Sequence, residues 1–241
     1  MPAAPSVAYG DHPHAVANLH LPSREGGPWP CVVLVHGGFW RSGWDRTLMT
    51  PLAHDLARRG VAAWNIEFRR VGQEGGGWPG TFHDVAAAVD HLAKVEQVDT
   101  ARVATCGHSA GGHLALWLAA NRGARAAIAL GSVCDLAAAE REQLGRRAVR
   151  ELFGEEAYDD ADPAQLLPLG IRQVLVHGVH DDRVPIEHAR NYAERARAAG
   201  DECVLLELDA GHFDVVDPRG PCFMRIVEAL TLVSGSAEGG A

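Results

Sequence analysis

Residues 107–112 join two segments of opposite character and read Gly107-His108-Ser109-Ala110-Gly111-Gly112. Residues 101–106 before them are rich in strand-forming residues, and residues 113–120 after them have helical composition. Glycines on both sides of Ser109 let a strand and a helix approach closely, because glycine has no Cβ atom. We therefore expect a strand–turn–helix unit with Ser109 in a strained conformation at the turn. The N-terminus of the helix would favour negative charge developing beside this serine.

Two later segments carry an acid and a histidine, in that order. The apolar run 174–177 predicts a buried strand, and Asp181 and Asp182 follow it. A carboxylate just past the carboxyl end of a parallel strand lies where such sheets collect catalytic groups. Adjacent residues do not both face one imidazole, and the D-x-x-V-P spacing favours Asp181, with Asp182 as a loop or capping residue. The strand predicted at 203–208 leads into the loop that carries His212.

These three residue types together indicate nucleophilic catalysis. We expect Ser109 to attack a carbonyl carbon, His212 to take the serine proton, and Asp181 to orient the imidazole and stabilise its charged form. The chain has 13 histidines, so most of them have other roles. His108 and His113 flank the nucleophile, and we interpret both as packing or pocket-wall residues.

A glycine turn after the first apolar strand completes the predicted machinery. The run 31–36 is followed by Gly37, Gly38 and Phe39. Backbone N–H groups of such a turn, from Gly38 or Phe39, would form an oxyanion hole together with the N–H of Ala110. The sequence does not decide between Gly38 and Phe39 as the donor.

Three tryptophans are candidate substrate contacts. Trp40 and Trp44 follow the glycine turn closely, and Trp78 lies in a glycine-rich loop. Trp40 and Trp44, together with Phe39, would favour a flat or aromatic substrate, and Trp78 would line the pocket. The alternative is that these large side chains pack in the core or against the pocket wall.

These motifs resemble the α/β-hydrolase superfamily, and specifically its HGG-bearing esterase branch. The string from His36 to Trp40 is similar to the HGGxW motif of serine-type arylformamidases and to the same loop in bacterial acyl and feruloyl esterases. The resemblance implies a cofactor-free and metal-free hydrolase of small carboxylic esters that works through an acyl-enzyme on Ser109. An arylformamidase, which cleaves an N-formyl group from an aromatic amine, would use the same triad and is the alternative. A non-catalytic ligand-binding relative is a more distant alternative, because no triad member is missing.

The fold expected from this pattern is of the α/β class: an α/β-hydrolase fold with a mostly parallel central sheet flanked by helices. Residues 132–173, where a cap would enter, leave room for one or two helices, so we expect a small cap or none. Residues 1–233 are predicted to form one domain and residues 234–241 a disordered tail. A further helix is predicted to be capped near Thr81 or Asp84. The remaining predicted helices span 45–59, 109–121, 187–199 and 220–233, and the predicted strands span 31–36, 61–66, 102–106, 126–131, 174–179 and 203–208.

Composition limits the classes of partner. A formal charge of −9 argues against a nucleic-acid partner, and the pairs Arg69-Arg70 and Arg146-Arg147 are interpreted as solvated or salt-bridged. The five cysteines form no C-x-x-C motif, which fits reduced thiols. The first residues have neither a basic nor an apolar signal region, and no apolar run approaches the roughly 18 residues that span a bilayer. We expect a cytoplasmic protein that has no membrane partner and acts on a small-molecule ester or amide.

Overall fold

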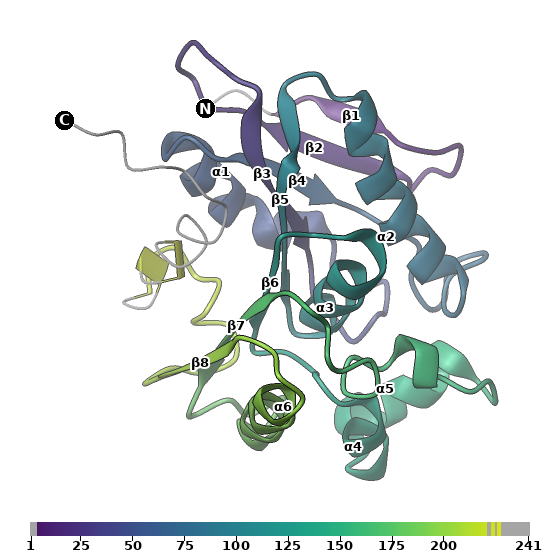
Figure 1. Cartoon of the computed structure of the whole chain (residues 1–241). Coiled ribbons are helices and arrows are strands. Elements are labelled where there is room, and N and C mark those ends of the chain that lie inside the picture. The colour runs from purple at the N-terminus through teal and green to yellow at the C-terminus, as the bar shows by residue number, and fades with distance from the viewer. Residues whose placement is uncertain (1–3, 221–222, 225, 228–241) are drawn as a thin grey trace.

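The computed structural model describes residues 4–220, 223, 224, 226 and 227 of the chain. Their strands form an eight-stranded sheet in the order β1-β2-β4-β3-β5-β6-β7-β8 (Figure 1). The pairs β1–β2 and β2–β4 are antiparallel, and every later pair is parallel. The strands are β1 (Ser6–Ala8), β2 (Val16–His20), β3 (Trp29–Val35), β4 (Ala62–Ile66), β5 (Val98–His108), β6 (Ala126–Leu130), β7 (Arg172–Gly178) and β8 (Cys203–Leu208).

Helices cover both faces of this sheet, so its central strands are buried on both sides. Side chains alternate along β3: Val32 and Leu34 join the core cluster that contains α1, whereas Val33 and Val35 join the cluster that contains α2 and α3. Figure 1 shows α6 beside β7 and β8. The helices are α1 (Thr50–Arg58), α2 (Gly80–Asp90), α3 (Ala110–Arg122), α4 (Leu136–Arg141), α5 (Leu144–Phe153) and α6 (Glu187–Ala198), with short 3₁₀ segments at Arg46–Met49, His91–Lys94 and Asp159–Ala161.

The predicted α/β-hydrolase architecture, a mostly parallel sheet with flanking helices, is confirmed. The helix predicted at 45–59 is divided into a 3₁₀ turn and α1, and Pro51 lies in the first turn of α1, where its missing N–H is tolerated. The predicted cap near Thr81 or Asp84 is wrong, because both residues lie inside α2 and neither caps it. Asp84 instead binds the Arg69 guanidinium at 2.6 and 2.8 Å.

The predicted small cap is confirmed, since residues 132–173 contain two short α-helices and one 3₁₀ turn. Figure 1 shows α4 and α5 side by side. The turn that opens α5 has positive φ at Gln143, Gly145, Arg146 and Arg147.

The C-terminal predictions are only partly open to comparison. Residues 223, 224, 226 and 227 of the helix predicted at 220–233 are helical, whereas its residues 221, 222, 225 and 228–233 lie outside the described residues, as does the predicted tail. The assignment of residues 1–233 to one domain stays a prediction. Nowhere in the described ranges does a helix have the length and apolar character that crossing a bilayer requires.

Candidate active site

Ser109 lies at the turn between β5 and α3, as the sequence predicts. Its φ of 55° and ψ of −121° are rare for a residue with a side chain, and its N–H donates to the Leu130 carbonyl at 2.8 Å. A Cβ atom on Gly107 would lie 1.9 Å from the Gly111 carbonyl oxygen, and one on Gly111 would lie 2.2 Å from the Val35 carbonyl oxygen. The two glycines are therefore required for the close approach of strand and helix that holds Ser109 in this conformation.

His212 is held by Asp181 and not by its neighbour Asp182. His212 Nδ1 and Asp181 Oδ2 are 2.7 Å apart, and both side chains are buried. The Asp182 carboxylate is exposed and pairs with Arg183 at 3.5 Å. Because the Nδ1 atom of His212 is used by Asp181, Nε2 is the ring nitrogen left for an exchange of protons with a substrate or a nucleophile.

A second histidine helps to keep the Asp181 carboxyl ionised. The Nε2–H of His177 lies 2.9 Å from the Val184 carbonyl and 3.3 Å from Asp181 Oδ2, and the Val184 N–H donates to Asp181 Oδ1 at 2.8 Å. Burial alone would raise the pKa of Asp181, but the hydrogen bonds from His177, His212 and Val184 hold it well below its usual value. The carboxyl is therefore an anion at neutral pH and can stabilise a charged His212.

Gly131 is a site residue that the sequence analysis missed. It follows β6 with φ of 51°, and a Cβ atom there would lie 3.2 Å from Asp181 Oδ2 and 3.3 Å from His212 Nδ1. Any side chain at this position would press on the acid–histidine pair. The available signal was a glycine at the last position of the strand predicted at 126–131, on the carboxyl edge of the sheet.

Ser109 and His212 line one cavity of about 160 Å³. Trp44 and Phe213 stack at its rim with ring centroids 5.3 Å apart, and both side chains are exposed. An apolar rim with a serine and a histidine in its wall suits a small acyl compound. The residues that line the cavity are Gly38, Phe39, Trp44, Leu48, His108, Ser109, Arg183, His212 and Phe213.

The backbone N–H groups named as oxyanion donors lie around this cavity. Gly38 and Phe39 line it, and within the described part of the chain neither of their N–H groups donates a hydrogen bond. Ala110 is the first residue of α3, where N–H groups have no acceptor inside the helix. A Cβ atom on Gly37 would lie 3.0 Å from the Cβ of Ser109, so the glycine turn approaches the serine closely.

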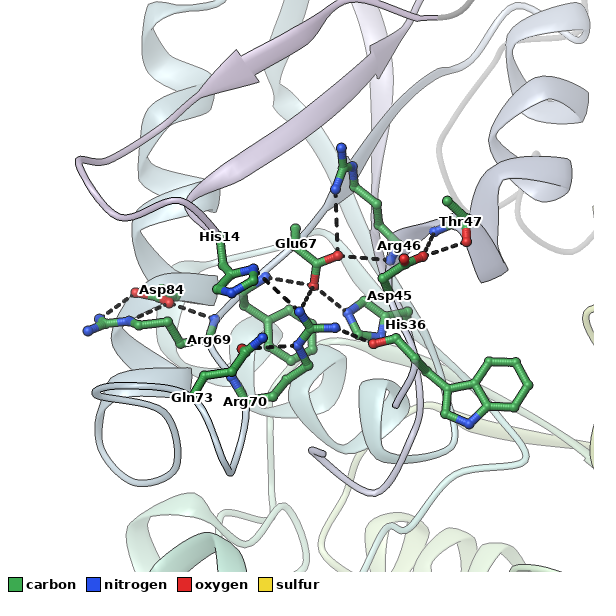
Figure 2. A network of polar contacts seen from close by, with 12 residues as sticks. His14, His36, Asp45, Arg46, Thr47, Glu67, Arg69, Arg70, Gln73 and Asp84 are labelled. Carbon is green, nitrogen blue, oxygen red and sulfur yellow. Dashed lines mark hydrogen bonds and ion pairs between the residues drawn. The ribbon is translucent and has the colours of Figure 1, made fainter. Parts of the chain in front are cut away.

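A network of polar contacts is joined to this glycine turn through His36 (Figure 2). The Glu67 carboxylate accepts hydrogen bonds from His36 Nε2 at 3.0 Å and from the Arg46 backbone N–H at 3.1 Å. His36 Nδ1 lies 2.8 Å from the Gly37 carbonyl, so both His36 bonds form only when each ring nitrogen carries a hydrogen. Burial would raise the pKa of Glu67, but the bond from His36 and the charges of His36 and Arg70 lower it below its usual value.

Arg70 connects the network to the cavity. Its guanidinium lies 3.2 Å from Glu67 Oε1, with only 5% of the Arg70 side chain exposed, and it also donates to the Trp44 carbonyl. Gln73 accepts a hydrogen bond from the Arg70 backbone N–H at 2.9 Å. The network thus spans the glycine turn and the Trp44 segment of the cavity wall. The ion pair of Arg70 agrees with the salt-bridged alternative expected for Arg69 and Arg70, whereas Glu67 was not identified from the sequence.

The three predicted tryptophan contacts have different outcomes. Trp44 lines the cavity, but Trp40 and Trp78 are not among its lining residues. Trp40 is buried and its Nε1–H donates to His113 Nδ1 at 3.2 Å, which makes both of them core residues. Trp78 packs against Phe82 with ring centroids 4.9 Å apart. We therefore remove Trp40 and Trp78 from the candidate binding surface.

His108 has the pocket-wall position expected of it. It lines the cavity, and its Nε2–H donates to the His212 carbonyl at 2.9 Å. Burial, followed by the nearby His212, lowers the pKa of His108 to about 3, so the ring is neutral at physiological pH. It supports the His212 backbone and contributes no charge to the site.

Comparison with known proteins places this site in a family. The model of the BD-FAE family matches residues 17–155, more than half of the chain. The esterase LipC of Mycobacterium tuberculosis is 30% identical over 246 residues, which cover 88% of this chain and 60% of LipC. The isoprenylcysteine alpha-carbonyl methylesterase ICME of Arabidopsis thaliana is 24% identical over 240 residues, covering 83% of this chain and 54% of ICME. The chain thus spans just over half the length of these two relatives.

Solved structures agree with the fold. The apo form of Thermogutta terrifontis esterase 2 superposes with a TM-score of 0.80 at 25% sequence identity, covering 96% of this chain and 94% of that one. The butyrate-bound form of the same esterase gives a TM-score of 0.82 at 23% identity and covers 100% of this chain. The shared fold agrees with the predicted superfamily. The chain belongs to the BD-FAE family and has the α/β-hydrolase fold.

Proposed function

We propose that the chain is a serine hydrolase that cleaves small carboxylic esters through an acyl-enzyme on Ser109. One observation carries the proposal: Ser109 and His212 line the same cavity, and His212 is fixed by an ionised, buried Asp181. A serine acts as a nucleophile when an adjacent base takes its proton and a third group orients that base. All three groups come from loops at the carboxyl edge of the sheet.

In the proposed reaction, Ser109 Oγ bonds to the carbonyl carbon of the ester while its proton passes to His212 Nε2. Asp181 stabilises the imidazolium that forms. The carbonyl oxygen becomes an oxyanion, which the N–H groups of Gly38 or Phe39 and of Ala110 would stabilise. His212 then protonates the leaving alcohol, the C–O bond breaks, and a water activated by His212 releases the acid from Ser109. Every step uses groups of the chain and water, so no cofactor is required.

The relatives support this chemistry and suggest the size of the acyl group. LipC is an esterase, and Thermogutta terrifontis esterase 2 has been solved with butyrate and with propionate bound. The cavity of about 160 Å³ beside Ser109 fits a similarly short acyl group. We therefore propose short-chain esters as substrates.

The experiment compares initial rates on p-nitrophenyl butyrate and on N-formylkynurenine, with Ser109→Ala as the control. The proposal predicts a higher kcat/KM on the ester and the loss of nearly all activity in Ser109→Ala, because triad members act as a unit. A much higher kcat/KM on N-formylkynurenine would favour the arylformamidase alternative, which uses the same three residues. A folded protein that is inactive on both would favour a ligand-binding relative.

A further inference from the structure

A second cavity adjoins the one that Ser109 lines. It measures about 410 Å³ and shares Phe39 and Arg183 with the first cavity. A substrate whose carbonyl lies beside Ser109 and whose remainder is longer than a short acyl group would extend past these two side chains. The residues that line the second cavity are Phe39, Arg41, Gly145, Arg146, Asp182 and Arg183.

The lining of the second cavity carries an excess of positive charge. Three arginines face one acid, in a chain whose formal net charge is −9. Arg41 is paired with Glu151 at 2.6 Å, and Arg183 is only loosely paired with Asp182 at 3.5 Å. Arg146 is exposed, and none of the described residues pairs with it. Two guanidinium groups thus have donors available toward the cavity.

The backbone fixes Arg146 at this position. Gln143, Arg146 and Arg147 have φ between 55° and 63°, which is unfavourable for residues with side chains. Gly145 in the same turn lies against Phe39, because a Cβ atom there would be 2.5 Å from the Phe39 ring. Strained turns of this kind gather at binding sites, where the surrounding structure determines them. The turn therefore packs on Phe39 and places Arg146 in the lining of the second cavity.

We propose that the substrate is an ester whose leaving group carries a carboxylate, which Arg146 and Arg183 bind in the second cavity. This inference rests on the proposed function and adds the chemical class of the leaving group. Guanidinium groups match carboxylates because their N–H donors form a planar fork. The acyl group occupies the smaller cavity beside Ser109, so the anionic end is assigned to the alcohol or phenol side of the ester.

Phenyl acetate and 4-acetoxybenzoate test the proposal. Both give the same acetyl-enzyme and differ only by a carboxylate on the leaving group, and their rates with hydroxide correct for intrinsic reactivity. The measured quantity is the ratio of kcat/KM for the anionic ester to kcat/KM for the neutral ester. We expect this ratio to exceed one in the unmodified enzyme and to decrease as salt is added, because exposed charges are screened.

The variants are Arg146→Gln, Arg183→Gln and their combination, with Arg102→Gln as the matched control. Arg102 is a partly exposed arginine near the start of β5, where it pairs with Asp99, and neither cavity includes it. The double variant should lower the ratio by about twofold to thirtyfold, the range for two exposed ion pairs, mainly through KM of the anionic ester. Arg146→Glu should lower it further than Arg146→Gln, and the control should leave it unchanged.

Failure of this inference is distinct from failure of the proposed function. Two results overturn the inference when Ser109-dependent hydrolysis of phenyl acetate is present. One is a ratio at or below one in the unmodified enzyme. The other is a ratio that stays at the value of the unmodified enzyme in both the double variant and Arg146→Glu. If a folded Ser109→Ala variant hydrolyses both esters as fast as the parent, or the parent hydrolyses neither, the proposed function fails and the inference fails with it.

Discussion

Glu67→Gln tests whether the buried network sets the geometry of the oxyanion loop. Oε1 of Glu67 accepts from His36 at 3.0 Å and from the Phe68 N–H at 3.2 Å, and Oε2 accepts from the Arg46 N–H at 3.1 Å. Both oxygens face donors, so the amide NH₂ of a glutamine would face a donor in either orientation. The substitution also removes the negative charge beside Arg70, whose side chain is buried.

The contacts set the size of the effect. Breaking a buried ion pair by removing one partner costs ~3–5 kcal/mol. Arg70 would keep its hydrogen bond to the Trp44 carbonyl, so we expect the free energy of unfolding to decrease by about 3 kcal/mol, the lower end of this range. Displacement of one oxyanion donor costs ~3 kcal/mol in the transition state, which is about a hundredfold in kcat. KM should change little, because these donors act on charge that forms only in the transition state.

Urea unfolding and ester hydrolysis well below the unfolding midpoint measure the two effects. Glu207→Gln is the matched control, since Glu207 forms a bidentate pair with Arg190 at 2.6 and 2.9 Å on the exposed surface. The control should lose no more than about 1 kcal/mol and keep its kcat. Parental kcat in Glu67→Gln, with a stability equal to that of the control, would show that the network does not position the oxyanion loop.

Three further predictions concern the site. Asp181→Asn should lower kcat by about 10⁴-fold while Asp182→Asn leaves kcat unchanged, and equal losses in steady-state rates would contradict the assignment. Gly131→Ala and Gly123→Ala both place a side chain at positive φ, and each should lose about 1–2 kcal/mol in urea unfolding. Only Gly131→Ala should also lower kcat, because a Cβ at Gly123 meets nothing within 4 Å. Glu67 and Asp181 have pKa values below their usual ones, so their stabilisation is complete above about pH 4.5 and is lost as both take up protons at lower pH. As the pH is lowered, the free energy of unfolding should therefore decrease less steeply in Glu67→Gln than in the parent, which urea unfolding at several pH values measures.

The elbow around Ser109 was predictable because its requirements are local. Strand-forming residues, small residues at fixed spacing and a helical run each act over a few positions, and they all agree here. The pairing of His212 with Asp181 was predictable from chain order and strand ends, because parallel strands bring their carboxyl ends to one edge.

The network around Glu67 was not predictable in the same way. Residues 67–70 read Glu-Phe-Arg-Arg after a strand, and this composition is also typical of an exposed loop. Only the tertiary fold brings His36 and Arg46 to the carboxylate, and burial then turns ordinary surface residues into a rigid support. The burial of the Trp40 side chain was not predictable from the sequence either. Its backbone has a positive φ of 58°, and the side chain lies in the core.

The central claim is that Ser109 is an activated nucleophile, and covalent labelling tests it most directly. Intact-protein mass spectrometry after treatment with a fluorophosphonate would count the adducts, and peptide mapping would locate them. We expect one adduct on Ser109, no adduct in Ser109→Ala, and much slower labelling in His212→Asn. A folded parent protein that stays unlabelled, or equal labelling in Ser109→Ala, would contradict it.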